Sequence, residues 1–597
     1  MFTCTYDGPR KDYAGVSQPL LVLYSADVHR ITLLVTIAEC AKSQNRNIQG
    51  QVPSGLLESR TIILCPPSLV DNWWDEFLIW APVPMEDNVG QLRKVVSGSK
   101  PSERLHEITA WYNDGGVLLI SYDLFRHYVH NKNTKSRSPP LNEEQHARII
   151  KELLKGPNII VADEAHKMKN ISSATTSAAN QFESKSRIAL TGSPLANNLE
   201  EYYAMINWIA PGYLGGIVNF RARYVEPIQE GLYQNSSSYE KRQCLKMLRV
   251  LKQDLDPKIN RADISVLKGS LKAKTEFVIK VPLTKLQEDA YRLYVQSMLG
   301  DTGDDEPGTA RLWDWLAILS LLCNHPLCFR NKLLEREAAA QQNTKAAATK
   351  SRQRVAQEGA VHSEDELLPG DEVVSKLGVS QRTIEKQLSL FDNVPGAMDS
   401  ISHSHKVEIF NQILDASMAA DDKVLVFSHS IPTLNYLEDL FKQTGRKYAR
   451  LDGKTKMSDR QKLTKDFNSG KAHVCLISTR AGGLGLNLPG ANRVVIFDFG
   501  FNPILEEQAV GRAYRIGQEK PVFVYRFTAG GTFEDRLHNQ AVFKTQLASR
   551  VVDKKNPTRF AIKGVRQYLF EPKPVAQKDL SNFIGKDPLV LDGILAR

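Results

Sequence analysis

Two adjacent carboxylates directly after an apolar run are the first candidates for chemistry in this chain. The stretch "NIIVADEAHKMKN" places Asp163 and Glu164 at the end of a predicted buried strand, where acidic side chains are costly unless they emerge into a site. An Asp at that point can hold Mg²⁺ through water, and the adjacent Glu can orient a water for in-line attack on phosphorus. The alternative is a chance D-E-A-H at a strand end, which composition predicts in roughly one chain of several hundred.

A second candidate cluster lies far downstream, in "LEEQAVGRAYRIGQ". Gln508, Arg512 and Arg515 are spaced i, i+4 and i+7, which predicts that they share one face of a helix. Two arginines on one face can close over a triphosphate and neutralise the charge that develops during phosphoryl transfer. For this segment alone, an exposed basic helix that makes surface salt bridges is the alternative. The acidic pair elsewhere in the chain favours the first interpretation.

Repeated strand, loop and helix patterns surround both clusters and indicate how they are positioned. The first set of apolar strands is "TIILCP", "VLLISYD", "NIIVADEAH" and "RIALTGSP". The second set begins near residue 423 and comprises "KVLVFSHS", "HVCLISTR", "RVVIFDFG" and "PVFVYRF". Apolar strands that end in polar residues are typical of parallel sheets with a site at the carboxyl ends. After the first strand, "PPSLVDNWWDEFLIW" has helical spacing, with Ser68 and Asp71 placed like a capping box.

The sequence therefore predicts an α/β protein with two parallel-sheet lobes and helical insertions between them. We expect a first lobe over 1–212, a helical insertion over 213–330, a flexible insertion over 331–403, a second lobe over 404–550 and a C-terminal tail over 551–597. The 597 residues carry a net charge of +10, which mildly favours a polyanionic partner. Seven scattered cysteines fit a reducing compartment, and we expect no membrane or secretion signal.

Taken in order, these motifs resemble the SWI/SNF-type ATPases of helicase superfamily two, double-stranded-DNA translocases that remodel chromatin. The resemblance covers roughly residues 60–330 and 404–550, and "LLCNHP" marks this group rather than the RNA helicases. In the second lobe, "RLDGKTKMSDRQKLTKDFN" and "LISTRAGGLGLNLPGANRVVIFD" follow the family pattern closely. Within the family, "YVEPIQEG" and "INRADISVL" look most like the branch of the alpha-thalassaemia X-linked remodeller and its androgen-receptor-interacting relative.

The resemblance implies two RecA-like lobes with ATP between them, Mg²⁺ as cofactor, and double-stranded DNA in nucleosomes and chromatin as partner in the nucleus. It implies that Asp163 takes the magnesium through water, that Glu164 takes the attacking water, and that His166 links hydrolysis to the lobe-coupling motif. The other implied residues are Thr191, Gly192, Ser193 and Asn197 for lobe coupling, Gly485 and Gln508 for the nucleotide, Arg512 and Arg515 as arginine fingers, and Ser68, Ser428, Thr479 and Arg480 for DNA phosphates. Phosphate contacts imply tracking without sequence readout and an affinity that falls steeply with salt. Ser and Thr at strand ends are as often simple helix caps.

The phosphate-binding loop is where the chain departs most from the family. "LLVLYSAD" resembles the strand and "ITLLVTIAE" the helix, but "VHR" stands where a G-x-G-K-T loop is required, and no other such loop occurs in the chain. Losing two or three charge-assisted bonds of about 1.5–3 kcal/mol each weakens binding by on the order of 5 kcal/mol, or roughly several thousandfold. Arg30 supplies a charge without the glycine geometry. Ser193 and Ala196 also replace the Thr and Gln common in the lobe-coupling motif.

Three functions stay open at this stage. The first is an ATP-dependent DNA translocase or chromatin-remodelling ATPase whose sequence starts at a wrong exon, so that the natural protein carries the loop upstream. The second is a catalytically dead paralogue that binds DNA or chromatin. The first is favoured because a lineage freed from ATP hydrolysis should not keep the acidic pair and both arginines in matching contexts. An RNA helicase of the DEAH class is less favoured, because the chain contains "LLCNHP" and "YRIGQ".

Overall fold

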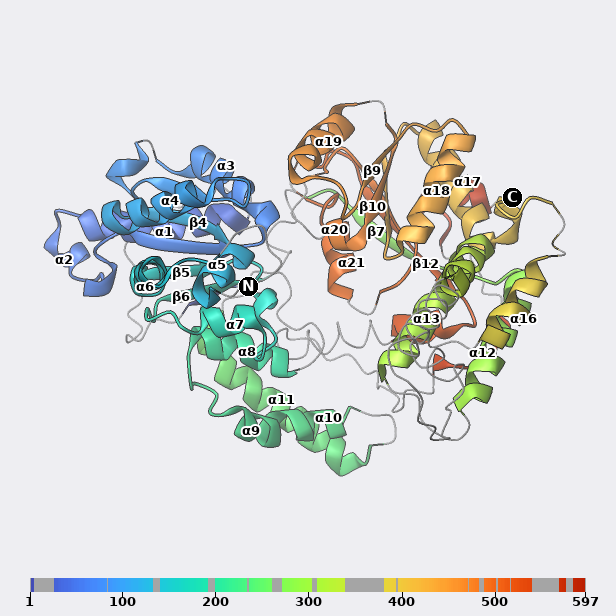
Figure 1. The fold of residues 1–597 in the computed structure, drawn as a ribbon, viewed down its shortest axis with the longest axis horizontal. Helices are drawn as coiled ribbons and strands as arrows, with labels where there is room; N and C mark the ends of the chain where they lie inside the picture. Colours follow the sequence, from blue (N-terminus) through green and yellow to red (C-terminus); the bar gives the residue numbers. More distant parts are fainter. Residues whose placement is uncertain are drawn as a thin grey trace, which may run out of the picture. The chain divides into compact units, whose positions relative to one another are not determined.

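The computed structural model divides the chain into two compact units, which are described separately (Figure 1). The first unit comprises Met1–Leu271 with Phe543–Ala561, and the second comprises Lys272–Val542 with Ile562–Arg597. The described residues are 2–4, 26–82, 84–131, 140–191, 199–232, 236–259, 271–302, 309–338, 381–392, 394, 396–470, 472–482, 488–500, 503–515, 517–539, 568–575 and 583–595. Among the helices in these ranges, none is both long and apolar enough to span a bilayer.

A six-stranded sheet with the order β1-β6-β5-β2-β4-β3 forms the centre of the first unit. Its strands are β1 (Phe2–Cys4), β2 (Arg60–Cys65), β3 (Leu92–Val95), β4 (Gly116–Ser121), β5 (Ile159–Ala162) and β6 (Arg187–Leu190). Neighbouring strands pair parallel, except that β1 runs antiparallel to β6. The strands β4 and β5 are buried along their whole length, as their continuous apolar runs predict for a sheet covered on both faces.

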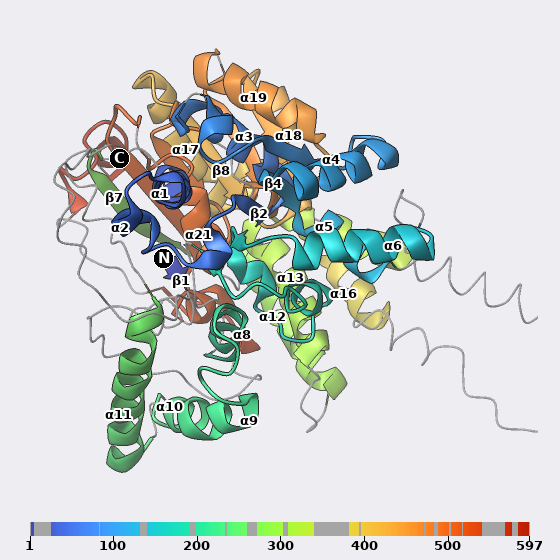
Figure 2. The ribbon, with the colours of Figure 1, turned by 90° about the vertical axis from the view of Figure 1, so that its left-hand side faces the viewer.

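Helices cover both faces of this sheet (Figure 2). The helices of the unit are α1 (Ala26–Lys42), α2 (Arg46–Gln49), α3 (Val70–Trp80), α4 (Pro101–Asp114), α5 (Tyr122–His130), α6 (Glu143–Ile150), α7 (Ala174–Ala179), α8 (Leu199–Ile209), α9 (Ile217–Phe220), α10 (Glu226–Glu230) and α11 (Ser238–Leu255). Ile62 and Leu64 of β2 pack in the core of α4 to α8, whereas Ile63 and Cys65 pack with α1 and α3. This alternation follows from the two-residue period of a strand.

The second unit also contains a six-stranded sheet, and all its strands are parallel. The order is β7-β12-β11-β8-β10-β9. The strands are β7 (Lys274–Val281), β8 (Val424–Ser428), β9 (Tyr448–Leu451), β10 (Val474–Ser478), β11 (Arg493–Ile496) and β12 (Val522–Ala529). The predicted fold class, two parallel-sheet α/β lobes with helices, is therefore confirmed.

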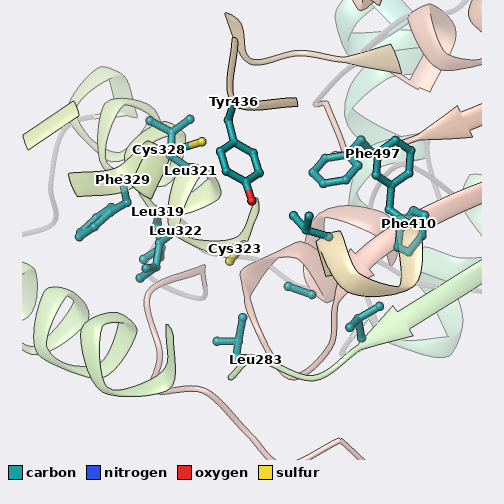
Figure 3. Packing of buried hydrophobic residues seen from close by; sticks show 14 of the residues in the cluster. Leu283, Leu319, Leu321, Leu322, Cys323, Cys328, Phe329, Phe410, Tyr436 and Phe497 are labelled. Atoms are coloured by element: carbon teal, nitrogen blue, oxygen red, sulfur yellow. The ribbon is translucent and has the colours of Figure 1, made fainter. Parts of the chain in front are cut away.

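Helices of the second unit build one large core and one smaller core on the sheet. They are α12 (Lys285–Thr302), α13 (Thr309–Asn324), α16 (Gln381–Phe391), α17 (His405–Ala419), α18 (Ile431–Gln443), α19 (Met457–Ser469), α20 (Thr479–Gly482), α21 (Pro503–Val510) and α23 (Leu591–Leu595). Figure 3 shows part of the large core, where Tyr436 of α18 lies between the α13 side chains and the ring of Phe497. Helices far apart in sequence thus share one core.

The structure divides the region between the lobes differently from the sequence expectation. The segment 213–330 does not form one insertion, because α9 to α11 belong to the first unit and β7, α12 and α13 belong to the second. β7 pairs along its full length with β12, so it completes the second sheet. Part of the expected flexible insertion is ordered, since α16 buries Ile384 and Phe391 in the large core. Residues 339–380 lie outside the described residues.

Residues of the expected C-terminal tail are part of the second unit's core. Tyr568, Leu569 and Val590 are buried there. Asp587 is fully buried and its Oδ2 lies 3.0 Å from Nη1 of Arg493, whose Nε donates to Asp422 at 2.7 Å. A buried guanidinium needs such partners, because an unpaired charge is costly in a dry core. The described part of the tail therefore helps to hold the second unit together.

Candidate functional site

The carboxyl end of β5 holds the acidic pair. Asp163 is buried, and its Oδ2 accepts a hydrogen bond from Nε1 of Trp73 at 2.9 Å, while its Oδ1 accepts one from the amide of Glu164 at 2.9 Å. The hydroxyl of Tyr122 donates to the Asp163 carbonyl at 2.8 Å. Burial raises the pKa of Tyr122 well above its usual value, and the negative charge of Asp163 raises it further. The phenol therefore remains a neutral donor. The site thus fixes both the backbone and the carboxylate of Asp163.

Glu164 adopts a conformation that few glutamates adopt. Its φ of 49° and ψ of 48° lie in the left-handed region, which costs on the order of 1–2 kcal/mol for a residue with a Cβ. Its Oε2 lies 3.1 Å from Nδ1 of His166 in the turn Ala165–Met168, and the same nitrogen lies 3.4 Å from Oγ1 of Thr191. A strained backbone held in this way is typical of functional sites.

His166 is predicted to link hydrolysis to the lobe-coupling motif, and it does contact Thr191, the first residue of that motif. This contact forms because β5 and β6 are parallel neighbours, so Asp163 and Thr191 emerge at the same edge of the sheet. Gly192, Ser193 and Asn197 lie outside the described residues, as does Gly485. Their roles stay predictions.

The segment in place of the phosphate loop is helical at its backbone. α1 begins at Ala26, so residues 28–30, expected in a loop, belong to the first turns of a helix. Most of the strand expected before them, residues 20–25, lies outside the described residues. Neither the sequence nor this backbone offers the glycine-rich turn that exposes several N–H groups to phosphate.

Ser68, predicted to contact DNA and to cap a helix, does not form the expected capping box. It lies in the 3₁₀ turn Pro67–Leu69, and α3 starts after Leu69 without a side-chain cap. Asp71 instead pairs with Lys94 at 2.8 Å. The turn intervenes because the two prolines before Ser68 favour a tight turn over a direct helix start. The Ser68 hydroxyl is buried without a hydrogen-bond partner in the described part of the chain.

In the second unit, Asp498 is the centre of a buried polar network beyond the end of β11. Its Oδ2 accepts hydrogen bonds from Oγ of Ser428 at 2.6 Å and from Nδ2 of Asn324 at 2.9 Å, and its Oδ1 accepts one from the His429 amide at 2.7 Å. The Asn324 Oδ1 accepts in turn from Nζ of Lys406 at 3.1 Å. The "LLCNHP" marker therefore ties the end of α13 to the strand ends of the sheet.

The predicted DNA contacts of this unit differ in exposure. Ser428 and Thr479 are buried, and Ser428 donates to Asp498, so neither side chain lies on the surface. Arg480, in the short helix α20 directly after β10, is exposed. Among the predicted phosphate contacts, Arg480 is thus the side chain that the structure places where a phosphate can reach it.

Gln508, Arg512 and Arg515 do not share one helix face, so that prediction is wrong. α21 ends at Val510, and the amides of Arg512, Ala513 and Arg515 make turn bonds instead. Gly511 follows the last helical residue, and glycine costs about 1 kcal/mol relative to alanine inside a helix. The two arginines lie half-buried in the turns that follow, and Gln508 lies half-buried on the helix.

Gln518 fixes the turn that carries the arginines. It is nearly buried, and its Nε2 donates to the carbonyls of Ala491 at 2.7 Å and Ala513 at 3.3 Å. The amide of Leu488 also donates to the Arg512 carbonyl at 3.2 Å. These hydrogen bonds hold the backbone of Arg512 in place, because α21 does not extend to this residue.

A buried carboxyl with a raised pKa lies at the start of α21. Burial raises the pKa of Glu506 to about 7, and Arg526 opposes this shift through its Nη1, 2.9 Å from Oε2. The Glu506 Oε1 accepts from the Gly500 amide at 3.0 Å and lies 3.9 Å from Nε2 of His429. Burial lowers the pKa of His429. Burial thus shifts the two pKa values in opposite directions, and both shifts favour the neutral form of the side chain.

Sequence reasoning missed three residues of these sites. Asp498 follows a buried strand as Asp163 does, so the strand-end signal that selects Asp163 selects Asp498 too. Trp73 was used only for helical periodicity, and nothing in its spacing shows that its indole reaches Asp163. Gln518 ends the motif "LEEQAVGRAYRIGQ", and a buried amide that donates to three carbonyls has no sequence signature.

Two family descriptions match the chain. The one described as "SNF2-related domain" matches residues 26–328, and the one described as "Helicase conserved C-terminal domain" matches residues 405–517. The first match alone covers half of the chain, and it includes the acidic pair of β5 and the "LLCNHP" segment.

The names of similar proteins refer to chromatin remodelling, to transcriptional regulation and to a helicase. The chain is 35% identical over 541 residues to "Protein CHROMATIN REMODELING 20" of Arabidopsis thaliana, covering 85% of this chain and 35% of that protein. It is 30% identical over 598 residues to "Transcriptional regulator ATRX" of Homo sapiens, covering 86% and 24%. It is 30% identical over 612 residues to "Helicase ARIP4" of Mus musculus, covering 87% and 41%. The chain thus spans between a quarter and two fifths of the length of these relatives.

Proposed function

This chain belongs to the SNF2-related family of helicase-like ATPases, and from that membership we propose that it is a DNA-dependent ATP hydrolase that moves along double-stranded DNA in chromatin. The observation that carries the proposal is the contact chain from Glu164 through His166 to Thr191, beside the buried Asp163. The names of the relatives, which refer to chromatin remodelling and transcriptional regulation, support a nuclear location and a chromatin substrate.

The donor set beyond β5 suits Mg²⁺, because two adjacent carboxylates supply the hard oxygen ligands that this ion prefers. Magnesium-bound ATP, when present, supplies the phosphorus atom under attack and the charge that must be neutralised. Asp163 would take the magnesium through water, and the Trp73 indole keeps its carboxylate in place. Glu164 orients the attacking water, and its contact with His166 fixes the carboxylate. Arg512 and Arg515 neutralise the transferred charge, as the family resemblance implies.

The start of α1 does not fit the phosphates of ATP, and this favours a second candidate function. Val28, His29 and Arg30 stand where the family has glycine, lysine and threonine, and their backbone is helical. No step of hydrolysis is assigned to this segment. A chain that cannot hold the triphosphate would bind DNA or chromatin without turnover, and the acidic pair would then serve the fold alone.

DNA binding is proposed to rest on phosphate contacts, with Arg480 as the leading contact because it is exposed. Contacts to phosphates release counterions, so the affinity for duplex DNA is expected to fall with salt and to depend little on sequence. A translocase of this kind needs no strand separation. Clear strand release from a forked duplex would contradict the proposal.

The deciding experiment measures ATP hydrolysis with and without duplex DNA. It compares the unaltered chain with a chain in which residues 26–30 are replaced by Gly-Ala-Gly-Lys-Thr, and with the same replacement combined with Glu164→Gln. DNA-stimulated hydrolysis by the unaltered chain would support the proposed function and would mean that the missing loop is dispensable. If only the loop-restored chain hydrolyses ATP, the catalytic residues are functional and the unaltered chain lacks only the phosphate-binding loop. Salt-sensitive DNA binding with no hydrolysis in either chain supports the second function.

A further inference from the structure

Helix α11 carries two opposite stripes of side chains. Cys244, Leu248, Leu251 and Leu255 recur at i, i+4, i+7 and i+11 and are buried in the core of the first unit. Half a turn around the helix, a second stripe lies mostly outside that core, and only Val250 at its edge still packs against it. We call this stripe the α11 outer face; it lines a shallow groove of about 240 Å³ and consists of Arg242, Leu245, Lys246, Arg249, Val250 and Gln253.

The unit holds α11 firmly, so the outer face is preformed. A capping box joins Ser237 and Glu240 at the start of the helix. At Gly231, just after α10, an added Cβ would lie 2.3 Å from the Cβ of Cys244, which shows how closely the chain approaches α11 there. Near its end, the Asp254 carbonyl accepts from the Tyr213 hydroxyl at 2.7 Å. In Figure 2, α9 and α10 lie on one side of α11 and leave its other side without a helix or strand of this unit.

Three cations of the outer face have no acidic partner. Arg242, Lys246 and Arg249 are exposed, and no carboxylate of the described residues lies within 4.0 Å of their charged nitrogens. Nearby, Arg221 does find a partner, with Nε 2.8 Å from Oε1 of Glu200. Like charges one turn apart weaken a helix. The Nε of Arg242 donates to the Ser238 carbonyl at 3.1 Å, but no described carboxylate neutralises any of the three cations. They therefore favour a negatively charged binding partner.

The groove also has an apolar component. Leu245 is 46% exposed beside the cations, and Val250 is half-buried on the other flank of the stripe. A DNA backbone would pair with the cations, but its sugars offer much less apolar surface to cover Leu245 than leucine side chains do. A protein segment that carries both carboxylates and leucines satisfies both features. The combination therefore favours a peptide over a nucleic acid.

We propose that the α11 outer face is a docking site for an acidic, leucine-bearing helical segment of a partner protein. Carboxylates of the segment pair with Arg242, Lys246 and Arg249, and its leucines cover Leu245 and Val250. The face runs over three turns of α11, about 16 Å, so a helical segment of about eleven residues fills it. This docking does not depend on ATP hydrolysis and stands whether or not the chain is an active enzyme.

The test is fluorescence anisotropy of a labelled peptide of about twelve residues, with glutamates and leucines at helical spacing, added to the full chain. The double variant Arg242→Glu/Arg249→Glu is expected to weaken binding by at least about tenfold, and Leu245→Ser by about threefold to fivefold. The matched control is Arg382→Glu/Lys386→Glu on α16, where two exposed cations also lie one turn apart. It makes the same charge change and is expected to alter binding by less than about twofold.

Two further peptides and a DNA duplex show whether binding depends on leucines, on carboxylates or on nucleic acid. A peptide with serines in place of the leucines is expected to bind about tenfold more weakly, and one with glutamines in place of the glutamates likewise. Equal binding of the serine peptide would overturn the proposal, as would equal losses in the α11 and α16 variants. A loss of duplex-DNA affinity in the α11 variant, with peptide binding unchanged, would assign the face to nucleic acid and also overturn it. The thermal unfolding of each variant is measured to check that it is folded. If the charge-reversal variant on α11 unfolds early, the milder Arg249→Gln is used in its place.

Discussion

An aspartate lies beyond a buried parallel strand in each unit, and the two have different surroundings. Asp163 directly follows β5, and Asp498 follows β11 by two residues; both are buried. Asp498 accepts hydrogen bonds from Ser428 and His429 at the end of β8 and from Asn324 at the end of α13, and an apolar Phe499 follows it. Asp163 is followed by a second carboxylate, that of Glu164, in a left-handed conformation and in contact with His166.

A strand-end aspartate alone therefore does not identify a catalytic site. Asp498 joins three segments of the second unit, which is a structural task. Asp163 lies beside a strained glutamate, and backbone strain persists only where the surroundings impose it. The strain and the second carboxylate, rather than the position on the strand, mark the first site as the candidate for chemistry.

Changing Glu164 should affect ATP turnover, whereas changing Asp498 should affect folding. In the loop-restored chain, Glu164→Gln should lower ATP turnover by about 10²–10⁴-fold, because an amide cannot take the proton of the attacking water. Thermal unfolding and the affinity for duplex DNA should remain unchanged. The control is Asp498→Asn, which should lower turnover only as far as it lowers the folded fraction. Turnover retained by Glu164→Gln would refute the assigned role of this carboxylate.

The second prediction concerns the contribution of the Asp498 carboxylate to the stability of the second unit. Asp498→Ala should lower the free energy of unfolding of the second unit by about 3–5 kcal/mol, because buried donors lose their charged acceptor. Denaturant unfolding followed by circular dichroism measures the loss. Asp163→Ala is the matched change in the first unit and should cost less, since fewer segments meet at that carboxylate. A loss below about 1 kcal/mol for Asp498→Ala would show that the network is dispensable.

The third prediction concerns the hydrogen bond from the Trp73 indole to Asp163. Trp73→Phe keeps the buried ring but removes the donor to Oδ2, and should cost about 1.5–3 kcal/mol, the worth of a hydrogen bond to a charged group. Trp74→Phe is the control, because Trp74 is half-buried with Nζ of Lys94 at 4.8 Å from its ring centroid. It should cost about 0.5–1 kcal/mol. Equal losses in the two variants would mean that the indole bond to Asp163 has no special weight.

The smallest effect is a change in pH dependence near Asp498. The folded pKa of Glu506, about 7, lies above its unfolded value, so the folded state binds more protons and Glu506 lowers stability as pH rises from about 4.5 to about 7. His429 acts oppositely: its pKa is lowered, so its contribution to stability is present above the unfolded pKa of about 6.5 and is lost as pH falls below it.

Glu506→Gln should therefore make the slope of unfolding free energy against pH more positive between about pH 5 and 7, by up to about 1.4 kcal/mol per unit. His429→Gln should make the slope less positive over the lower part of the same range. Chemical denaturation at several pH values measures both slopes. Slope changes of the same sign in the two variants would contradict the assignment of opposite shifts.

Much of the fold was predictable from local pattern. Continuous apolar runs such as "TIILC" predict buried parallel strands because both faces of such strands are covered. The same logic located Asp163, since a carboxylate directly after such a run must emerge at the sheet edge. The end of α21 before Arg512 and Arg515 was not predictable from spacing alone, because periodicity shows which residues would share a helix face but not that the helix ends at Val510.

The sequence by itself determined the two sheets, the acidic pair and the absence of a phosphate loop, because strand period, burial of apolar runs and motif composition are local properties. Only the tertiary structure decided that β7 completes the second sheet, that Asp587 of the tail pairs with Arg493, and that Trp73 reaches Asp163. These contacts join residues 90 or more positions apart. They depend on packing geometry, which no spacing within a single segment encodes.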